Sequence, residues 1–109
     1  MISVSFKNDT EGRIIGFKTV GHAGFAAFGK DIICAAVSVL TVNTVNSIDS
    51  FTDDDFFVDQ NEKKGIVHFE FKGVPSEAGE LLLKSYELGI KDIVSTYDNK
   101  FIKIIKWEV

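Results

Sequence analysis

The sequence of 109 residues contains only one cysteine and one proline. A single cysteine excludes an internal disulfide, and it excludes a zinc cluster built on several cysteines. Cys34 is therefore expected to be a free thiol, which is typical of a cytoplasmic protein. We expect no metal and no cofactor.

Positive charge is also scarce. The formal net charge is −4, and the only adjacent basic residues are Lys63 and Lys64. No basic stripe is available to meet a phosphate backbone, so direct nucleic-acid binding is not expected. The most apolar stretch, residues 32–42, is too short to cross a bilayer, and the N-terminus has no signal-peptide pattern. The sequence therefore predicts a cytoplasmic protein without a membrane partner.

What is present fits one soluble domain over residues 1–109, with 45% hydrophobic and 26% charged residues. Alternating apolar and polar residues predict five strands, at residues 2–8, 13–20, 56–60, 65–72 and 101–108. One helix follows Asp31 and ends near residues 46–49; it is apolar nearly all round, which predicts that it is central and buried. A second, amphipathic helix opens at Pro75-Ser76. The order ββαββαβ, rich in hairpins, predicts an α+β fold with a mainly antiparallel sheet and two helices packed on it.

A glycine-rich segment, residues 21–30, separates the second strand from the first helix. Its glycines are Gly21, Gly24 and Gly29, and it also carries His22 and two phenylalanines. Such loops commonly hold functional groups. The glycine spacing fits neither a P-loop nor a dinucleotide-binding loop, so phosphate binding is a minor alternative. Phe25 and Phe28 fit a core or the walls of a pocket equally well.

Cys34 lies near the start of the first helix, at its third position if Asp31 is the N-cap. The helix dipole is worth about 0.3–1 kcal/mol there, which is too little to hold a thiolate at neutral pH. A nucleophilic Cys34 therefore requires an imidazole. His22 is the candidate, because His68 falls in mid-strand on the face opposite the phenylalanines.

The same residues also have purely structural interpretations. A lone cysteine on an apolar helix is usually a packed small hydrophobe. Asp31 either caps the helix or pairs with His22 and orients it. The Ser38 hydroxyl, one turn beyond the cysteine, can simply bond to the helix backbone. From the residues alone, the packed Cys34 is the stronger interpretation.

The segment from Gly21 to Ser38 resembles the Prp family, the bacterial ribosomal-processing cysteine proteases. The family pattern is Gly-His-Ala, then Gly-x-Asp, two aliphatic residues, Cys-Ala and a serine four residues past the cysteine. The matching positions are Gly21-His22-Ala23, Gly29-Lys30-Asp31, Ile32-Ile33, Cys34-Ala35 and Ser38. The chain length and the element order are similar to the family as well.

The resemblance implies that Cys34 is the nucleophile and His22 the base, with Asp31 as an orienting member. It implies a homodimer with a mobile His-bearing loop. The implied substrate is a large-subunit ribosomal protein precursor, which loses a short N-terminal extension after an aromatic residue. Substrate-binding or site-shaping roles are expected for Gly21, Ala23, Gly24, Phe25, Phe28, Gly29 and Ser38. The alternative function is a non-catalytic ribosome-assembly or interaction module with a packed or redox-sensing Cys34.

Overall fold

The computed structural model describes residues 1–21, 30–97 and 101–108, without the side chains of residues 30–31 and 106–108. Its elements are β1 (Ile2–Asn8), β2 (Ile14–Val20), α1 (Lys30–Phe51), β3 (Phe56–Asn61), β4 (Ile66–Phe71), α2 (Glu77–Tyr97) and β5 (Ile102–Glu108). This order confirms the predicted ββαββαβ arrangement.

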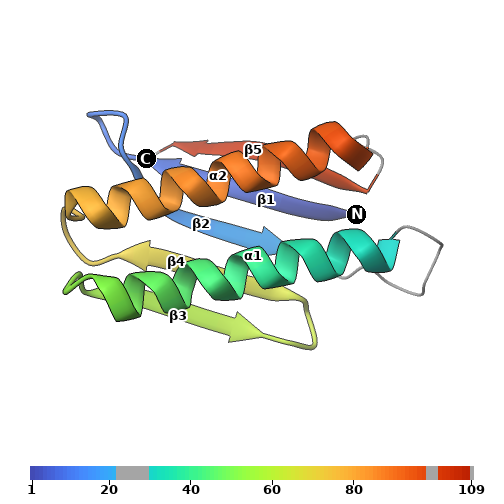
Figure 1. The fold of residues 1–109 in the computed structure, drawn as a ribbon, viewed down its shortest axis with the longest axis horizontal. Coiled ribbons are helices and arrows are strands. Elements are labelled where there is room, and N and C mark those ends of the chain that lie inside the picture. The colour runs from blue at the N-terminus through green and yellow to red at the C-terminus, as the bar shows by residue number, and fades with distance from the viewer. Residues whose placement is uncertain (22–29, 98–100, 109) are drawn as a thin grey trace.

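The strands form one five-stranded sheet in the order β3-β4-β2-β1-β5 (Figure 1). Three neighbouring pairs are antiparallel, and β1 pairs with β5 in parallel. The mainly antiparallel sheet is therefore confirmed, with one parallel edge. Both hairpins are local, whereas the β2–β4 pairing joins them across the whole of α1.

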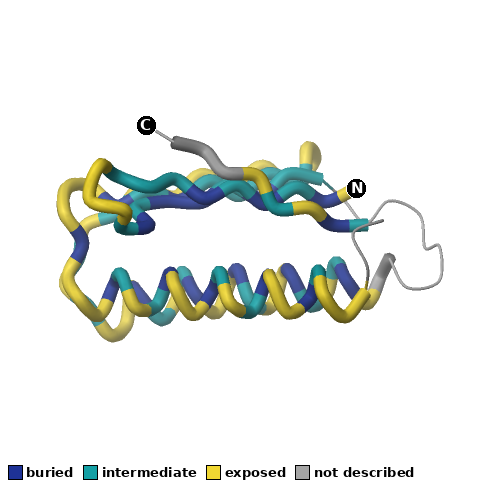
Figure 2. Tube along the Cα trace, turned by 90° about the horizontal axis from the view of Figure 1, so that it is seen from above, coloured by how far each residue is buried: buried dark blue, intermediate teal, exposed yellow. Residues whose placement is uncertain are grey.

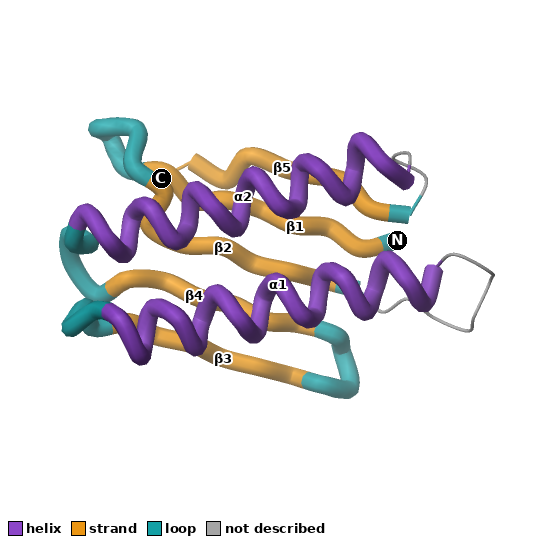
Figure 3. Tube along the Cα trace, viewed as in Figure 1, coloured by secondary structure: helices purple, strands orange, loops and turns teal. Residues whose placement is uncertain are grey.

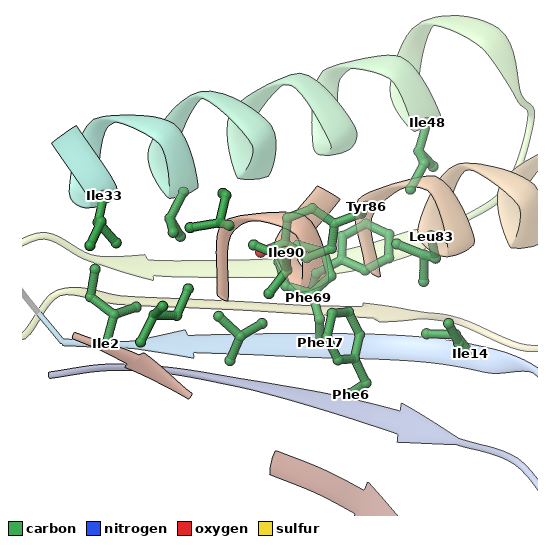
Figure 4. Packing of buried hydrophobic residues seen from close by; sticks show 14 of the residues in the cluster. Ile2, Phe6, Ile14, Phe17, Ile33, Ile48, Phe69, Leu83, Tyr86 and Ile90 are labelled. Atoms are coloured by element: carbon green, nitrogen blue, oxygen red, sulfur yellow. The ribbon is translucent and has the colours of Figure 1, made fainter. Parts of the chain in front are cut away.

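Both helices lie on the same face of the sheet, and the core fills the space between the two layers (Figures 2 and 4). The alternation in β1 explains this arrangement, because Val4 and Phe6 are buried toward the helices while Ser3 and Ser5 face the other way. Figure 3 shows that no described helix covers that opposite face. The fold is thus two layers, with one sheet face partly open to solvent.

Helix α1 is not buried all round, so that prediction was wrong. One stripe of the helix faces the sheet and is buried, comprising Ile33, Val37, Thr41, Thr44 and Ile48. On the other side Val39 is 68% exposed and Val42 is 54% exposed. The segment Ile32–Phe51 also has the length and the mean hydropathy, 1.5, of a membrane span, a property that core helices of soluble proteins share. In this structure one face of α1 packs on the sheet, and its other face is exposed.

The helix starts differ slightly from the predicted ones. Helix α1 begins at Lys30, so Asp31 lies inside its first turn rather than at its N-cap. Helix α2 begins at Glu77, so Pro75 precedes the helix instead of opening its first turn as predicted. Ser76 caps it: the Ser76 Oγ accepts the N–H of Gly79 at 3.1 Å. The Ser76 hydroxyl also donates to Asp54 at 2.7 Å, which joins the cap to the segment after α1.

Tyr86 of α2 connects the two helices with the sheet. Its ring lies 4.5 Å from the ring of Phe17 and 5.7 Å from that of Phe6, between centroids. Its hydroxyl oxygen lies 2.8 Å from the Oγ1 of Thr41 on α1. Thr41 donates its own proton to the Val37 carbonyl at 2.7 Å, so Tyr86 is the donor to Thr41. Burial raises the pKa of Tyr86 above its usual value, which keeps this donor protonated.

We predict that the two ends of this hydrogen bond differ in their effect on stability. In Tyr86→Phe, Thr41 keeps its bond to Val37, and we expect a loss of about 0.5–1.5 kcal/mol. In Thr41→Val, the buried Tyr86 hydroxyl loses its acceptor, and we expect about 1–3 kcal/mol. Urea denaturation of both variants measures the difference. An equal or larger loss in Tyr86→Phe would contradict the assigned donor direction.

Candidate active site

Cys34 lies in the second turn of α1, because the helix begins at Lys30. Its side chain is partly buried and packs against the edge of the hydrophobic core. The dipole of a helix acts mainly within its first turn. Cys34 therefore lies farther from the helix start than the expected third position.

The thiol lines a cavity of about 190 Å³, which lies where β1 and β4 begin and β2 and β3 end. One wall is α1, with Cys34, Val37, Ser38, Thr41 and Val42. The facing wall is the β3–β4 hairpin, with Gln60, Asn61, Glu62, Gly65, Ile66 and Val67. At about 30 Å³ per water, the space corresponds to roughly six waters, the scale of one large side chain.

Ser38 and Thr41 both line this cavity, but their hydroxyls behave differently. Thr41 bonds back to the helix carbonyl of Val37 and to Tyr86, and it is buried. Ser38 is exposed, and none of the hydrogen bonds between described residues uses its hydroxyl. A site-shaping role for Ser38 therefore stays a prediction, made at a position that borders the cavity.

Gly21, at the end of β2, is the root of the glycine-rich segment. Its φ angle is 118°, a conformation that side chains rarely adopt. Its N–H donates to the Gly65 carbonyl in the opposite hairpin at 3.0 Å. A Cβ at this position would collide with the carbonyl oxygen of Met1. Only glycine fits here without strain. The hydrogen bond from Gly21 to Gly65 joins the end of β2 to the β3–β4 hairpin.

Several predicted site residues lie outside the described residues. They are His22, Ala23, Gly24, Phe25, Phe28 and Gly29, together with the side chain of Asp31. The structure thus brings Cys34, Ser38 and Gly21 to one cavity, and the roles of all the predicted site residues stay predictions.

The second histidine lies away from this cavity. His68 is on β4, on the sheet face opposite the helices, since its neighbour Phe69 is buried beneath them. Its Nε2 lies 2.8 Å from Glu70, which also pairs with Lys7. These hydrogen bonds, first from Lys7 and then from His68, hold the pKa of Glu70 below its usual value. His68 belongs to a surface ion-pair group.

The sequence did not point to the hairpin wall. Gln60, Asn61 and Glu62 face the cavity because the β2–β4 pairing places the β3–β4 turn beside the start of α1. Pairing between distant strands leaves no local signal, so the polar residues of this turn resemble those of any other turn. Among the described residues, no group of three His, Cys, Asp or Glu side chains is placed to hold a metal ion.

Comparison with known proteins gives concordant matches. A family model described as Cysteine protease Prp matches residues 1–103. The ribosomal processing cysteine protease Prp of Bacillus subtilis is 28% identical over 101 residues, which cover 89% of this chain and 90% of that protein.

Two solved structures of the ribosomal processing protease Prp from S. aureus share the fold. The complex with a substrate peptide has a TM-score of 0.91 at 23% identity, covering 98% of this chain and all of that one. The complex with a covalently linked product peptide has a TM-score of 0.88 at 24% identity, with the same coverage.

We predict that Gly21→Ala destabilises the protein more than Gly12→Ala. Gly12 also has a positive φ, 81°, but a Cβ there would meet nothing within 4 Å. We expect Gly12→Ala to lose about 1–2 kcal/mol from backbone strain alone. Gly21→Ala adds the collision with Met1, so its loss should be clearly larger. Urea denaturation of the two variants is the measurement, and equal losses would show that the Met1 contact yields easily.

Proposed function

This chain belongs to the cysteine protease Prp family, and we propose that Cys34 is its nucleophile and His22 its general base. The chain is thus a cysteine protease. The observation that supports this assignment most is the position of Cys34, the only thiol of the chain, in the wall of the cavity. His68 lies on the opposite face of the sheet, which leaves His22 as the only other imidazole.

The proposed reaction runs through a thioester. His22 takes the proton from the Cys34 sulfur, which attacks the carbonyl carbon of the scissile bond. The C–N bond breaks, and His22 gives the proton to the leaving amine. Water then attacks the thioester with help from His22, which releases the acid and restores the thiol. Backbone N–H groups near the start of α1 and in the glycine-rich segment would stabilise the oxyanion. The S. aureus neighbour with a covalently linked product peptide is consistent with such a covalent path.

The proposed substrate is a large-subunit ribosomal protein precursor, from which the enzyme removes a short N-terminal extension after an aromatic residue. The B. subtilis relative is named a ribosomal processing protease, which supports this substrate class. The cavity supports it as well, because Ile2, Val37 and Val42 offer apolar surface beside Cys34. An extended peptide would run between α1 and the hairpin.

We propose that the enzyme acts in the bacterial cytoplasm, where its precursor substrate is made and where a free thiol stays reduced. A homodimer is also proposed. Exposed apolar side chains on the helix layer, such as Val39 and Leu88, provide surface that a second copy would bury.

We predict that Cys34→Ala abolishes cleavage of an N-terminally extended precursor, because no other thiol exists to form the thioester. His22→Ala should lower kcat by about 10²–10⁴-fold, the usual contribution of a general base. Mass spectrometry of the precursor measures both effects. His68→Gln is the matched control for the imidazole and should retain full activity, since His68 is on the other sheet face.

Two outcomes would contradict this assignment. Cleavage by Cys34→Ala at the wild-type rate would exclude Cys34 as nucleophile. Equal activity of His22→Ala and His68→Gln would exclude His22 as base. The same chain offers a second measurement, because iodoacetamide can label only Cys34. A thiolate paired with His22 should react quickly at pH 6, and His22→Ala should slow that reaction.

We propose, further, that Asp31 orients His22. Asp31→Asn removes the charge but keeps a side chain of the same shape. If Asp31 pairs with His22, we expect kcat to fall, by up to about 10⁴-fold as for the aspartate of a catalytic triad. The free energy of unfolding should change by less than about 1 kcal/mol, the usual effect of one charge in the first turn of a helix. Peptide kinetics together with urea denaturation separate the two roles, and unchanged kcat would leave Asp31 with a helix-terminal role only.

A further inference from the structure

We infer that Glu62 determines specificity by binding a lysine or arginine side chain of the peptide substrate close to the scissile bond. The inference rests on the proposed protease function and adds the chemical character of one substrate residue. It comes from the wall of the cavity that faces Cys34, which is formed by the β3–β4 hairpin.

In the turn of this hairpin, Glu62 lines the cavity, whereas the neighbouring Lys63 and Lys64 do not. The carbonyl of Glu62 accepts the N–H of Gly65 at 3.2 Å, and Gly65 has a positive φ of 63°. Lys63 and Lys64 therefore occupy the two corner positions of a β-turn. Of these four residues, only Glu62 and Gly65 line the cavity. The turn is at the same end of the sheet as the start of α1 (Figure 1).

The turn is also held in place, which a binding residue needs. The Asn61 side-chain oxygen accepts the N–H of Lys64 at 3.1 Å. The Gly65 carbonyl accepts the N–H of Gly21, which joins the turn to β2. The backbone that carries Glu62 is therefore held on both sides by hydrogen bonds.

Glu62 is the only carboxylate among the described residues that line the cavity, and no lysine or arginine is among them. None of the ion pairs between described residues uses Glu62. A lysine or arginine side chain of the substrate would pair with this carboxylate at the moment of binding. The net charge of −4 favours approach of the same basic segment.

The experiment uses a short peptide of alanine and serine with one phenylalanine at the cleavage position. Lysine, glutamine or glutamate is placed at each other position in turn. For the wild type we expect one position at which lysine lowers KM about two- to fivefold relative to glutamine, as an exposed ion pair allows. The kcat should not change, and the preference should shrink as the salt concentration rises.

Three variants test the origin of this preference. In Glu62→Gln the lysine preference should disappear, and in Glu62→Lys the same position should prefer glutamate. Glu11→Gln is the matched control, because Glu11 is an exposed carboxylate in the β1–β2 turn and does not line the cavity. It should keep the preference of the wild type.

Cleavage without any lysine preference, or a preference that survives in Glu62→Gln, would overturn this inference and leave the proposed function intact. Absence of cleavage of the precursor and of every peptide would overturn the proposed function instead. Binding of the same fluorescent peptides to Cys34→Ala, with and without Glu62→Gln, then decides the inference independently of chemistry. A lysine preference in binding that depends on Glu62 supports it, and equal binding of lysine and glutamine peptides overturns it.

Discussion

The hydrogen bond between Tyr86 and Thr41 is the contact on which the position of Cys34, the proposed nucleophile, depends. It is buried, and it joins the two helices at the point where Tyr86 also packs on Phe17 and Phe6. Thr41 also lines the cavity, two helical turns from Cys34. One threonine therefore belongs both to the core and to the site. Thr41 therefore connects Tyr86 to the wall that carries the thiol through a packed interior, which transmits strain.

The facing wall depends on a different kind of contact. The β3–β4 hairpin is attached to the rest of the sheet through the pairing of β4 with β2. At the end of that pairing, the N–H of Gly21 donates to the Gly65 carbonyl, so the root of the glycine-rich segment and the hairpin wall share one hydrogen bond. Gly21 tolerates no side chain at this point because the Met1 carbonyl lies against it. The N-terminus thus contributes to the site twice, through the Met1 carbonyl against Gly21 and through Ile2 of β1, which lines the cavity.

Some of these features follow from local sequence patterns and others from pairing between distant strands. This difference decides which parts of the molecule the sequence could predict. The elements follow from local patterns, since alternation marks the strands and Pro75-Ser76 marks the start of α2. The proposed nucleophile could be suggested only by its motif, because a lone cysteine on a helix is usually packed, and Cys34 does pack partly against the core. The burial of α1 was overestimated, since its composition hides the fact that Val39 faces solvent. The hairpin wall could not be predicted at all, because the strand order depends on pairing between β2 and β4.

The two walls of the cavity also differ in how well they tolerate substitutions. Residues on the inner side of α1, such as Val37 and Thr41, are buried, so substitution there costs stability as well as activity. Glu62 is exposed on a turn at the edge of the sheet, where substitutions usually change stability little. In such a site the proposed nucleophile is on the wall where substitution costs stability, and the proposed substrate contact is on the wall that tolerates substitution. Substrate preference can then change through the hairpin while the position of Cys34 stays fixed by the core.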